Sequence, residues 1–312
     1  MNVGLNHLID DGLAAHVDES RAFVAASAAS ASSRPPPDPS TPDGLRAARN
    51  QLASRPAPAG RLVTEQVAEA GTRHVPVRII RPQEREPRAV YLEIHGGGFY
   101  LSSAARSDAR NARLADAVGV AVVSVDYRLA PEHPWPAAPD DCETAATWLL
   151  QHAEPMFGTA RLAIGGASAG ANLAVTTLLR LRDKGLVAPF VGAALQFGAY
   201  DLSGQSPGGR AIADEFFIKA YAGNVADRTN PDISPLFGDL AGLPPSLLVV
   251  GTTDILLEDN LAMAARLSSA GAEVDVRVYP ESPHGFTSFP TAMAEAAMTR
   301  IEAWLDDRLN EK

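Results

Sequence analysis

The apolar positions of the chain change their period near residue 61. Between residues 61 and 82, apolar and polar residues alternate in RLVTEQVAEA and HVPVRIIRP, on either side of a turn at residues 70–72. This alternation, broken by one short turn, predicts an antiparallel β-hairpin. Short, continuous apolar runs follow, and they predict buried strands at residues 89–94, 119–125, 161–166, 191–198, 246–251 and 274–280.

Stretches with apolar residues at helical spacing lie between these runs. They predict helices at residues 109–118, 142–153, 171–185, 260–271 and 291–309. Buried strands that alternate with helices are typical of a parallel sheet whose two faces are both covered by helices. The sequence therefore predicts an α/β fold built on a mostly parallel sheet.

Two segments do not fit this alternation. Residues 1–55 contain an alanine-rich helical stretch, a proline-rich break and a second short helix that starts near Pro42. Residues 201–239 lie between two predicted strands, and they are far longer than the usual connection of about 2–6 residues. We expect these two segments to form a helical lid over a core that spans residues 56–312.

Composition and charge narrow the class of protein. The chain has 312 residues, of which 46% are hydrophobic and 21% are charged, as in ordinary soluble domains. The net charge of −10 argues against a nucleic-acid partner, because phosphate binding requires a basic surface. The N-terminus does not resemble a signal peptide, and no apolar run approaches the roughly 20 residues that span a bilayer. We expect a cytoplasmic protein without a membrane span.

The single cysteine, Cys142, excludes an internal disulfide and favours a reducing compartment. It lies in a predicted amphipathic helix, so we interpret it as a packed, inert thiol and not as a nucleophile. The histidines His7, His16, His74 and His152 have no metal-ligand spacing with one another or with the cysteine. The sequence therefore predicts no metal site.

Residues 166–170, GASAG, fit the pattern G-x-S-x-G between a predicted strand and a predicted helix. A tight turn at this place exposes the hydroxyl of Ser168, and the helix N-terminus behind it favours developing negative charge. Gly166 and Gly170 leave room for the strand and the helix to cross closely. A purely structural turn is the alternative, because Gly and Ser are common in turns. The strand-turn-helix context favours a nucleophile.

A serine nucleophile needs a general base, and the base needs an acid that orients it. His284 is the only histidine after Ser168, and it lies in a loop between the last predicted strand and the last helix. Asp254 directly follows the preceding strand and is the preferred acid. Glu258 and Asp259 are the alternative acids. Each could instead have a structural role, capping or solvating the start of the next helix.

The stretch HGGG, residues 95–98, follows the strand predicted at residues 89–94. Consecutive glycines weaken regular structure and occur where the backbone bends sharply or another group approaches it closely. Taken alone, the run also fits a plain turn. Acyl transfer, however, needs amide donors for an oxyanion, and these come from Ala169 and from a loop of this type. We expect His95 to stabilise the loop by hydrogen bonding, without a role in proton transfer.

Together, these motifs resemble those of the hormone-sensitive lipase family of α/β-hydrolases, also called bacterial family IV esterases. The resemblance rests on HGGGF (95–99), VDYRLAPEHPWPAA (125–138), GASAGANLA (166–174), DILLED (254–259) and HGF (284–286). It implies the α/β-hydrolase fold, with a mostly parallel eight-stranded sheet, helices on both faces and a helical cap. It also implies that no cofactor or metal is needed. A homodimer is one option, since many members of the family are dimers.

The resemblance further implies the roles of individual residues. Ser168, Asp254 and His284 would form a catalytic triad. The backbone amides of Gly97, Gly98 and Ala169 would form the oxyanion hole. Gly96 would be a supporting residue of the same glycine loop. Two positions depart from the family pattern. Ala167 stands where the family usually has an aspartate, and Leu257 replaces a basic residue. Neither change removes a catalytic group.

The function that the resemblance implies is a serine carboxylesterase for short- to medium-chain acyl esters, with a small-molecule ester as substrate. An amidase, a lactonase or a deacetylase would use the same residues, so these activities stay open. A small-ligand receptor without catalysis is a less favoured alternative. Receptors of this fold lack a working base, whereas His284 is present here.

Overall fold

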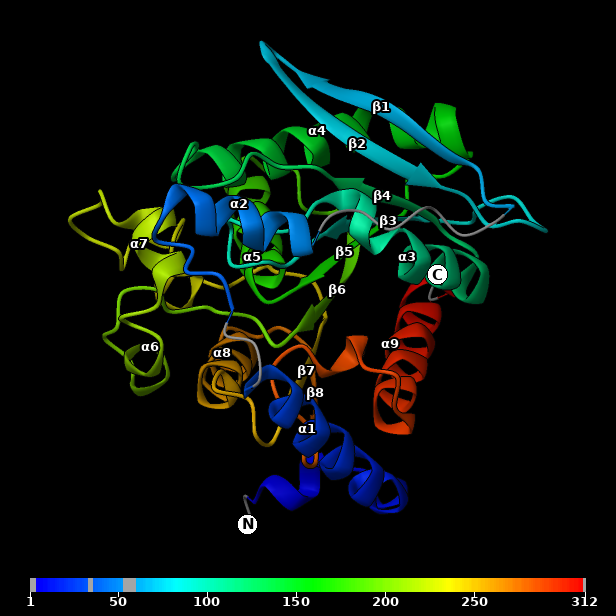
Figure 1. Ribbon diagram of the computed structural model, residues 1–312. Helices are drawn as coiled ribbons and strands as arrows, with labels where there is room; N and C mark the ends of the chain where they lie inside the picture. Colours follow the sequence, from blue (N-terminus) through cyan, green and yellow to red (C-terminus); the bar gives the residue numbers. More distant parts are fainter. Residues whose placement is uncertain (1–3, 33–35, 53–59, 311–312) are drawn as a thin grey trace.

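An eight-stranded β-sheet forms the centre of the molecule (Figure 1). The computed structural model describes residues 4–32, 36–52 and 60–310. The hairpin and all six apolar runs that the sequence predicted are strands of this sheet. The strands are β1 (Val63–Ala70), β2 (Arg73–Ile80), β3 (Val90–Ile94), β4 (Ala121–Val125), β5 (Leu162–Ala167), β6 (Phe190–Gln196), β7 (Ser246–Gly251) and β8 (Val274–Tyr279).

The strand order across the sheet is β1-β2-β4-β3-β5-β6-β7-β8. Strand β2 runs antiparallel to both of its neighbours, with Val63 opposite Ile80 and Val77 opposite Val125. From β4 to β8, all neighbouring strands are parallel. Parallel strands end at the same edge of a sheet, so the loops after β3, β5, β7 and β8 meet there. This is the edge at which α/β proteins place their ligand sites.

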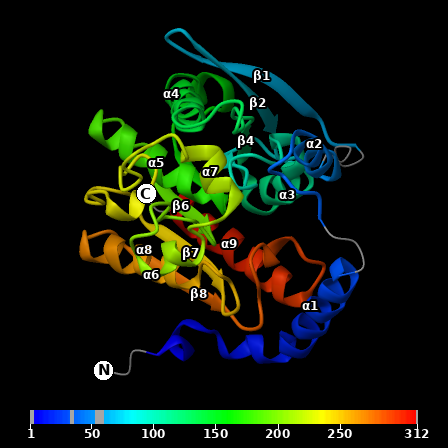
Figure 2. The same cartoon turned by 60° about the vertical axis from the view of Figure 1, so that its left-hand side comes forward.

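Helices cover both faces of the sheet, which confirms the predicted α/β fold (Figures 1 and 2). Helices α4, α5 and α8 contribute to the apolar layer on one face, and α3 and α9 to the layer on the other. The helix predicted at residues 142–153 is longer in the structure and begins at Ala137. Pro139 lies in its first turn, where proline is tolerated because no helical amide donor is needed there. The five helices are α3 (Asp108–Leu114), α4 (Ala137–Phe157), α5 (Ala169–Asp183), α8 (Leu257–Ser269) and α9 (Ala292–Asn310).

The two apolar layers follow from the alternation of side chains along the buried strands. In β3, Leu92 and Ile94 belong to one layer and Tyr91 to the other, because successive residues of a strand point to opposite faces. Cys142 is buried in the first layer, and burial raises the pKa of its thiol. A buried, protonated thiol is a poor nucleophile, which confirms the packed thiol expected from the sequence.

The N-terminal region is helical, as predicted, and its parts lie in two places. Helix α1 packs against α9 and against the segment that follows β8 (Figure 2). Helix α2 lies elsewhere, and Arg49 near its end donates hydrogen bonds of 3.0 Å to the Tyr100 carbonyl and 2.8 Å to the Ala130 carbonyl. The elements of this region are η1 (Leu5–Leu8), η2 (Asp11–His16), α1 (Val17–Ser32) and α2 (Pro42–Gln51).

The long connection between β6 and β7 packs on the loop that follows β3. The Tyr221 ring stacks on the Phe99 ring with centroids 3.9 Å apart, and the Phe216 ring meets the Tyr100 ring edge-on at 5.1 Å. Helix α2 and this connection therefore contact the same loop. The elements of the connection are α6 (Pro207–Ala211), α7 (Phe216–Ala222) and η5 (Pro235–Phe237), and the other short helical segments are η3 (Ala104–Ser107), η4 (Ala115–Gly119) and η6 (Phe286–Ser288).

Candidate active site

Ser168 occupies a strained turn between β5 and α5. Its backbone has φ 55° and ψ −119°, in the positive-φ region that side-chain-bearing residues rarely adopt. The turn is held by a hydrogen bond of 2.9 Å from the Ser168 amide to the Gln196 carbonyl. A Cβ atom on Gly166 or Gly170 would lie 2.3 or 2.0 Å from the Ile94 carbonyl oxygen. The two glycines thus allow the close crossing of strand and helix that the sequence predicted.

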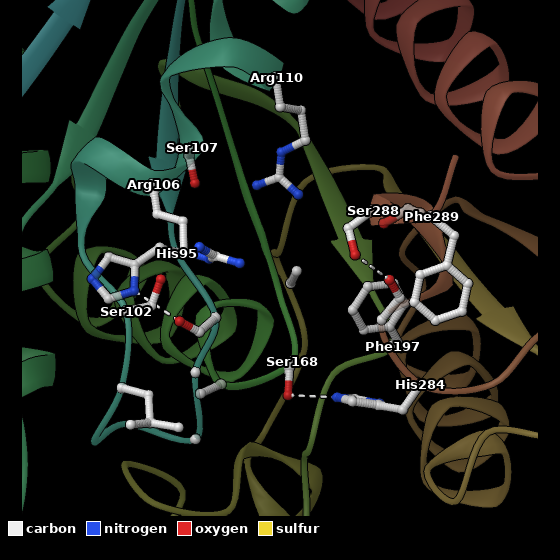
Figure 3. A pocket seen from close by; sticks show the side chains of 18 of the residues that line it. His95, Ser102, Arg106, Ser107, Arg110, Ser168, Phe197, His284, Ser288 and Phe289 are labelled. Atoms are coloured by element: carbon white, nitrogen blue, oxygen red, sulfur yellow. Dashed lines mark hydrogen bonds between the residues drawn. The ribbon is translucent and has the colours of Figure 1, made fainter. Parts of the chain in front are cut away.

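The side chains of Ser168, His284 and Asp254 form one continuous hydrogen-bonded series (Figure 3). The distance from Ser168 Oγ to His284 Nε2 is 2.9 Å. His284 Nδ1 lies 3.1 Å from both carboxylate oxygens of Asp254. The Asp254 side chain is fully buried, whereas the His284 side chain is 38% exposed. This geometry keeps a proton on Nδ1 and leaves Nε2 free to accept the serine proton.

The three side chains come from the loops after β5, β7 and β8, which explains why residues so distant in sequence meet. Asp254 also accepts a hydrogen bond of 2.8 Å from the Leu256 amide, so its carboxylate is fixed in place. The alternative acids lie apart from the histidine. Glu258 is exposed on α8, and Asp259 accepts hydrogen bonds from the amides of Tyr200 and Asp201.

The glycine loop after β3 places unused amides beside Ser168. Among the described residues, no hydrogen bond uses the amides of Gly97, Gly98 or Ala169. Gly97 has φ 124°, and a Cβ atom there would lie 2.3 Å from the Leu101 carbonyl oxygen, so only glycine fits this turn. Gly96 packs against the serine turn, because a Cβ atom would lie 2.6 Å from the Ala167 carbonyl oxygen. Ala167 itself brings no charge to the nucleophile.

His95 contacts the glycine loop through its buried side chain. Its Nδ1 lies 2.8 Å from the Gly96 carbonyl oxygen, and its ring stacks on the Tyr127 ring with centroids 4.2 Å apart. The Tyr127 hydroxyl donates a hydrogen bond of 2.9 Å to the His95 carbonyl. Burial lowers the pKa of His95, so its imidazole is neutral. The hydrogen bond matches the supporting role that the sequence predicted.

Several residues that hold the site were not predicted as site residues. The Ala130 amide donates a hydrogen bond of 2.9 Å to the Phe99 carbonyl, so the segment at residues 125–138 braces the glycine loop. The Phe197 ring meets the His284 ring edge-on at 5.0 Å. The family-like motif at residues 125–138 could have pointed to the role of Ala130 in supporting the glycine loop. Phe197 directly follows the buried strand β6, and nothing in the sequence distinguishes it.

A cavity of about 1200 Å³ opens above the serine (Figure 3). One part of its wall is apolar and includes side chains from the residue after α2, the β6–β7 connection and the loop after Asp254. These side chains are Leu52, Ile212, Phe217 and Ile255. Another part is polar and comes from the segment between β3 and β4. Figure 3 shows the guanidinium groups of Arg106 and Arg110 there, pointing into the cavity. Neither arginine was predicted from the sequence as a site residue.

The remaining histidines named from the sequence lie outside this cavity. His74 Nδ1 is 3.1 Å from Glu69 Oε1, and His152 Nδ1 is 2.8 Å from the Trp148 carbonyl oxygen. Within the described ranges, no three or more His, Cys, Asp or Glu side chains are grouped so that they could hold a metal ion. The same ranges contain no helix with the length and apolar character needed to cross a bilayer.

Comparisons with known proteins agree with this fold. A family described as "alpha/beta hydrolase fold" matches residues 91–288, which is more than half of the chain. The ethyl acetate hydrolase of Pseudomonas putida is 33% identical over 71% of this chain and 74% of its own length. The carboxylesterase NlhH of Mycobacterium tuberculosis is 32% identical over 82% of this chain and 86% of its own length.

Solved structures show the same likeness. One is described as an esterase from the bacterial hormone-sensitive lipase family. It superposes with a TM-score of 0.75 at 28% identity, over 85% of this chain and 92% of its own.

Proposed function

Because this chain belongs to the α/β-hydrolase fold family and resembles its hormone-sensitive lipase esterases, we propose that it is a carboxylesterase that works through Ser168. The observation that carries the proposal is the series from Ser168 Oγ through the His284 ring to the Asp254 carboxylate, with distances of 2.9 and 3.1 Å. A serine hydroxyl is a weak nucleophile at neutral pH, and this arrangement supplies the base and the orienting acid that it needs.

The first half of the reaction forms an acyl-enzyme. Ser168 Oγ attacks the ester carbonyl carbon while His284 Nε2 takes the hydroxyl proton. Asp254 stabilises the resulting imidazolium through the hydrogen bond at Nδ1. The carbonyl oxygen becomes an oxyanion, which the free amides of Gly97, Gly98 and Ala169 bind. The tetrahedral intermediate then collapses, and His284 gives the proton to the departing alkoxide, so that an alcohol leaves.

The second half repeats these steps with water. His284 Nε2 takes a proton from a water molecule, whose oxygen attacks the acyl carbon on Ser168 Oγ. The same three amides bind the second oxyanion. When the intermediate collapses, Ser168 Oγ regains the proton from His284 and the carboxylic acid is released. The strained backbone at Ser168 keeps its oxygen at the mouth of the turn through both halves.

We also propose that α2 and the connection at residues 201–239 act as a cap over the core at residues 56–312. Its support is that Leu52 of the N-terminal region, together with Ile212 and Phe217, contributes apolar walls to the cavity. The apolar wall formed by these side chains supports the burial of a short or medium acyl chain.

Hydrolysis of p-nitrophenyl esters with acyl chains from two to sixteen carbons tests the proposal, with Ser168→Ala as the matched control. We expect activity to be highest on short to medium chains and to vanish in Ser168→Ala. If no ester in the series is hydrolysed faster than by Ser168→Ala, the esterase assignment is wrong. The same pair of proteins is then assayed on amides, lactones and acetylated substrates.

A further inference from the structure

Arg106 is an arginine without a counter-ion in the wall of the candidate active site. It lies on η3, a few residues after the glycine loop, and its half-buried side chain lines the cavity. In the part of the chain that the structure describes, its guanidinium has neither an ion-pair nor a hydrogen-bond partner. A guanidinium that is partly removed from water without a partner is costly, unless a ligand supplies the missing acceptors.

The acidic side chains near Arg106 are already engaged. Glu93 Oε1 accepts hydrogen bonds of 2.8 Å from Arg110 Nη2 and 3.1 Å from Ser107 Oγ, and the Glu93 side chain is only 2% exposed. Asp126 accepts a hydrogen bond of 2.9 Å from the Ala104 amide. Neither Glu93 nor Asp126 forms an ion pair or a hydrogen bond with Arg106.

The opposite wall of the cavity does not neutralise Arg106 either. Glu295 of α9 lines the cavity, but it forms an ion pair with Arg113. Glu302 binds the same guanidinium at 2.5 Å. Arg113 is therefore satisfied by two carboxylates, and Arg110 by one. Glu215 also lines the cavity but forms no ion pair with Arg106, so among the described arginines of the lining Arg106 is the one without a carboxylate partner.

We propose that the ester substrate carries a carboxylate, and that Arg106, assisted by the free N–H groups of Arg110, binds it. This inference rests on the proposed esterase function. A guanidinium offers a planar pair of donors that matches a carboxylate, and such charge-assisted bonds are among the strongest in proteins. Figure 3 shows both guanidinium groups directed into the same part of the cavity.

The carboxylate belongs to the acyl part of the ester. The alcohol must leave next to His284 Nε2, which gives it a proton, so the acyl part extends away from His284. In Figure 3, Arg106 lies on the side of His95, across the cavity from His284. The substrate class is therefore a monoester of a dicarboxylic acid. Its hydrolysis yields an alcohol and a dicarboxylate.

The test compares substrates that differ only in charge. The first pair is monomethyl adipate and its terminal amide, which has the same shape without the charge. The second pair is 4-acetoxybenzoate and 4-acetoxybenzamide, which carry the difference on the leaving group. The readout is the ratio of kcat/KM for the acid to kcat/KM for the amide within each pair, measured by product release at low and high NaCl.

Four variants accompany the wild-type chain. Arg106→Gln removes the charge, Arg106→Lys keeps it, and Arg110→Gln removes the assisting group. Arg46→Gln is the matched control, because Arg46 is an exposed residue of α2 whose ion-pair partner is Asp43. The melting temperature of each variant shows that it is folded.

We expect the wild-type ratio for the adipate pair to be about tenfold in favour of the acid and to fall with added NaCl. Arg106→Gln should bring the ratio close to one, mainly through KM. Arg106→Lys should restore part of it, and Arg46→Gln should leave it unchanged. A wild-type ratio of one or less, or a ratio that Arg106→Gln does not change, overturns the proposal. If Arg106 favours the acid only in the pair that carries the charge on the leaving group, the proposal that the carboxylate belongs to the acyl part is wrong.

Failure of this inference is distinguishable from failure of the esterase function. If the wild-type chain hydrolyses neither member of either pair faster than Ser168→Ala does, the esterase proposal fails. If it hydrolyses the uncharged amide members but shows no preference for the acids, the esterase proposal stands and the carboxylate site is wrong.

Discussion

Ser20 Oγ of helix α1 donates a hydrogen bond of 2.8 Å to the carbonyl oxygen of Glu281, three residues before His284. The two residues are 261 positions apart in the chain. Glu281 has φ 48°, a conformation that needs support from outside its own loop. A second contact, 2.9 Å from the Ala292 amide to Glu19 Oε2, holds the other end of the same segment. Helix α1 thus restrains the loop that carries the candidate base.

Ser20→Ala should therefore lower activity although Ser20 lies outside the cavity. Loss of a buried hydrogen bond costs about 1 kcal/mol of stability, and we expect a several-fold fall in kcat with p-nitrophenyl butyrate as the His284 loop loosens. The control is Ser27→Ala, an exposed position of the same helix. Equal kcat values for the two variants would show that α1 does not position the loop.

Asp254→Asn should lower kcat by about 10³ to 10⁴, because an amide cannot hold the imidazole in the correct tautomer or stabilise its charged form. The matched control is Glu258→Gln, an exposed acid of α8 that the sequence left open as an alternative. Its kcat should equal that of the wild type. The assignment of the acid is reversed if Glu258→Gln is the variant that loses activity.

Gly97→Ala should lower kcat by about 10² to 10³, the usual cost of a lost oxyanion donor. The new methyl group would lie 2.3 Å from the Leu101 carbonyl oxygen, so the loop must shift and its amides with it. Gly271→Ala is a fair control, because Gly271 has φ 89° and open space around its Cβ position. Both variants should lose some stability, but only Gly97→Ala should lose activity.

The buried carboxyl of Asp259 should make stability depend on pH. Burial raises its pKa from 3.8 to about 7, although hydrogen bonds from the Tyr200 and Asp201 amides act in the opposite direction. Between these two values the folded chain keeps a proton that the unfolded chain has lost. The Asp259 contribution to stability is therefore full below about pH 4 and is lost as the pH rises to 7.

Asp259→Asn removes this titration. The difference in unfolding free energy, variant minus wild type, should be larger at pH 7 than at pH 5. A pKa shift from 3.8 to about 7 corresponds to at most about 4 kcal/mol over its full pH range. Urea unfolding at a series of pH values measures the difference. Parallel pH profiles of unfolding free energy for the two proteins would rule out a raised pKa.

Asp232→Asn should loosen the connection at residues 201–239. Asp232 receives hydrogen bonds from Arg180 of α5 at 2.5 and 2.6 Å and from Trp135 Nε1 at 2.8 Å. Breaking a largely buried ion pair leaves a charge poorly compensated, so we expect a loss of roughly 2 kcal/mol. Asp183→Asn breaks the exposed pair with Arg182 and should change stability by less than about 0.5 kcal/mol. Chemical denaturation of both variants decides between these outcomes.

The fold was predictable because its signals are local. Each buried strand is a continuous apolar run, and the hairpin β1–β2 alternates between apolar and polar residues, so every strand was found within a few residues. Helix α4 begins at Ala137, before the helical spacing at residues 142–153 becomes clear, and a proline in its first turn needs no amide donor. The residues that we expect to act on the substrate could be proposed from the sequence because each lies in a short motif at a strand end.

The supporting residues could not be predicted in the same way. Ser20 and Arg49 act through contacts with segments distant in sequence, and no spacing rule relates them to the motifs they serve. Arg106 is one of many charged residues in a polar helical stretch. Its lack of a counter-ion becomes visible only when the positions of Glu93 and Glu295 are known.

The N-terminal segment also lies against one edge strand of the sheet. Strand β8 is one edge of the sheet, and η1 lies against it, with an ion pair of 3.0 Å between Asp10 and Arg277 of β8. Strand β1 is the other edge of the sheet, and its side chains include the exposed Glu65 and Glu69. Growth of a continuous sheet through many copies requires two free edges on each copy. Because η1 lies against β8 and β1 carries acidic side chains, we expect strand-to-strand addition between copies to be disfavoured.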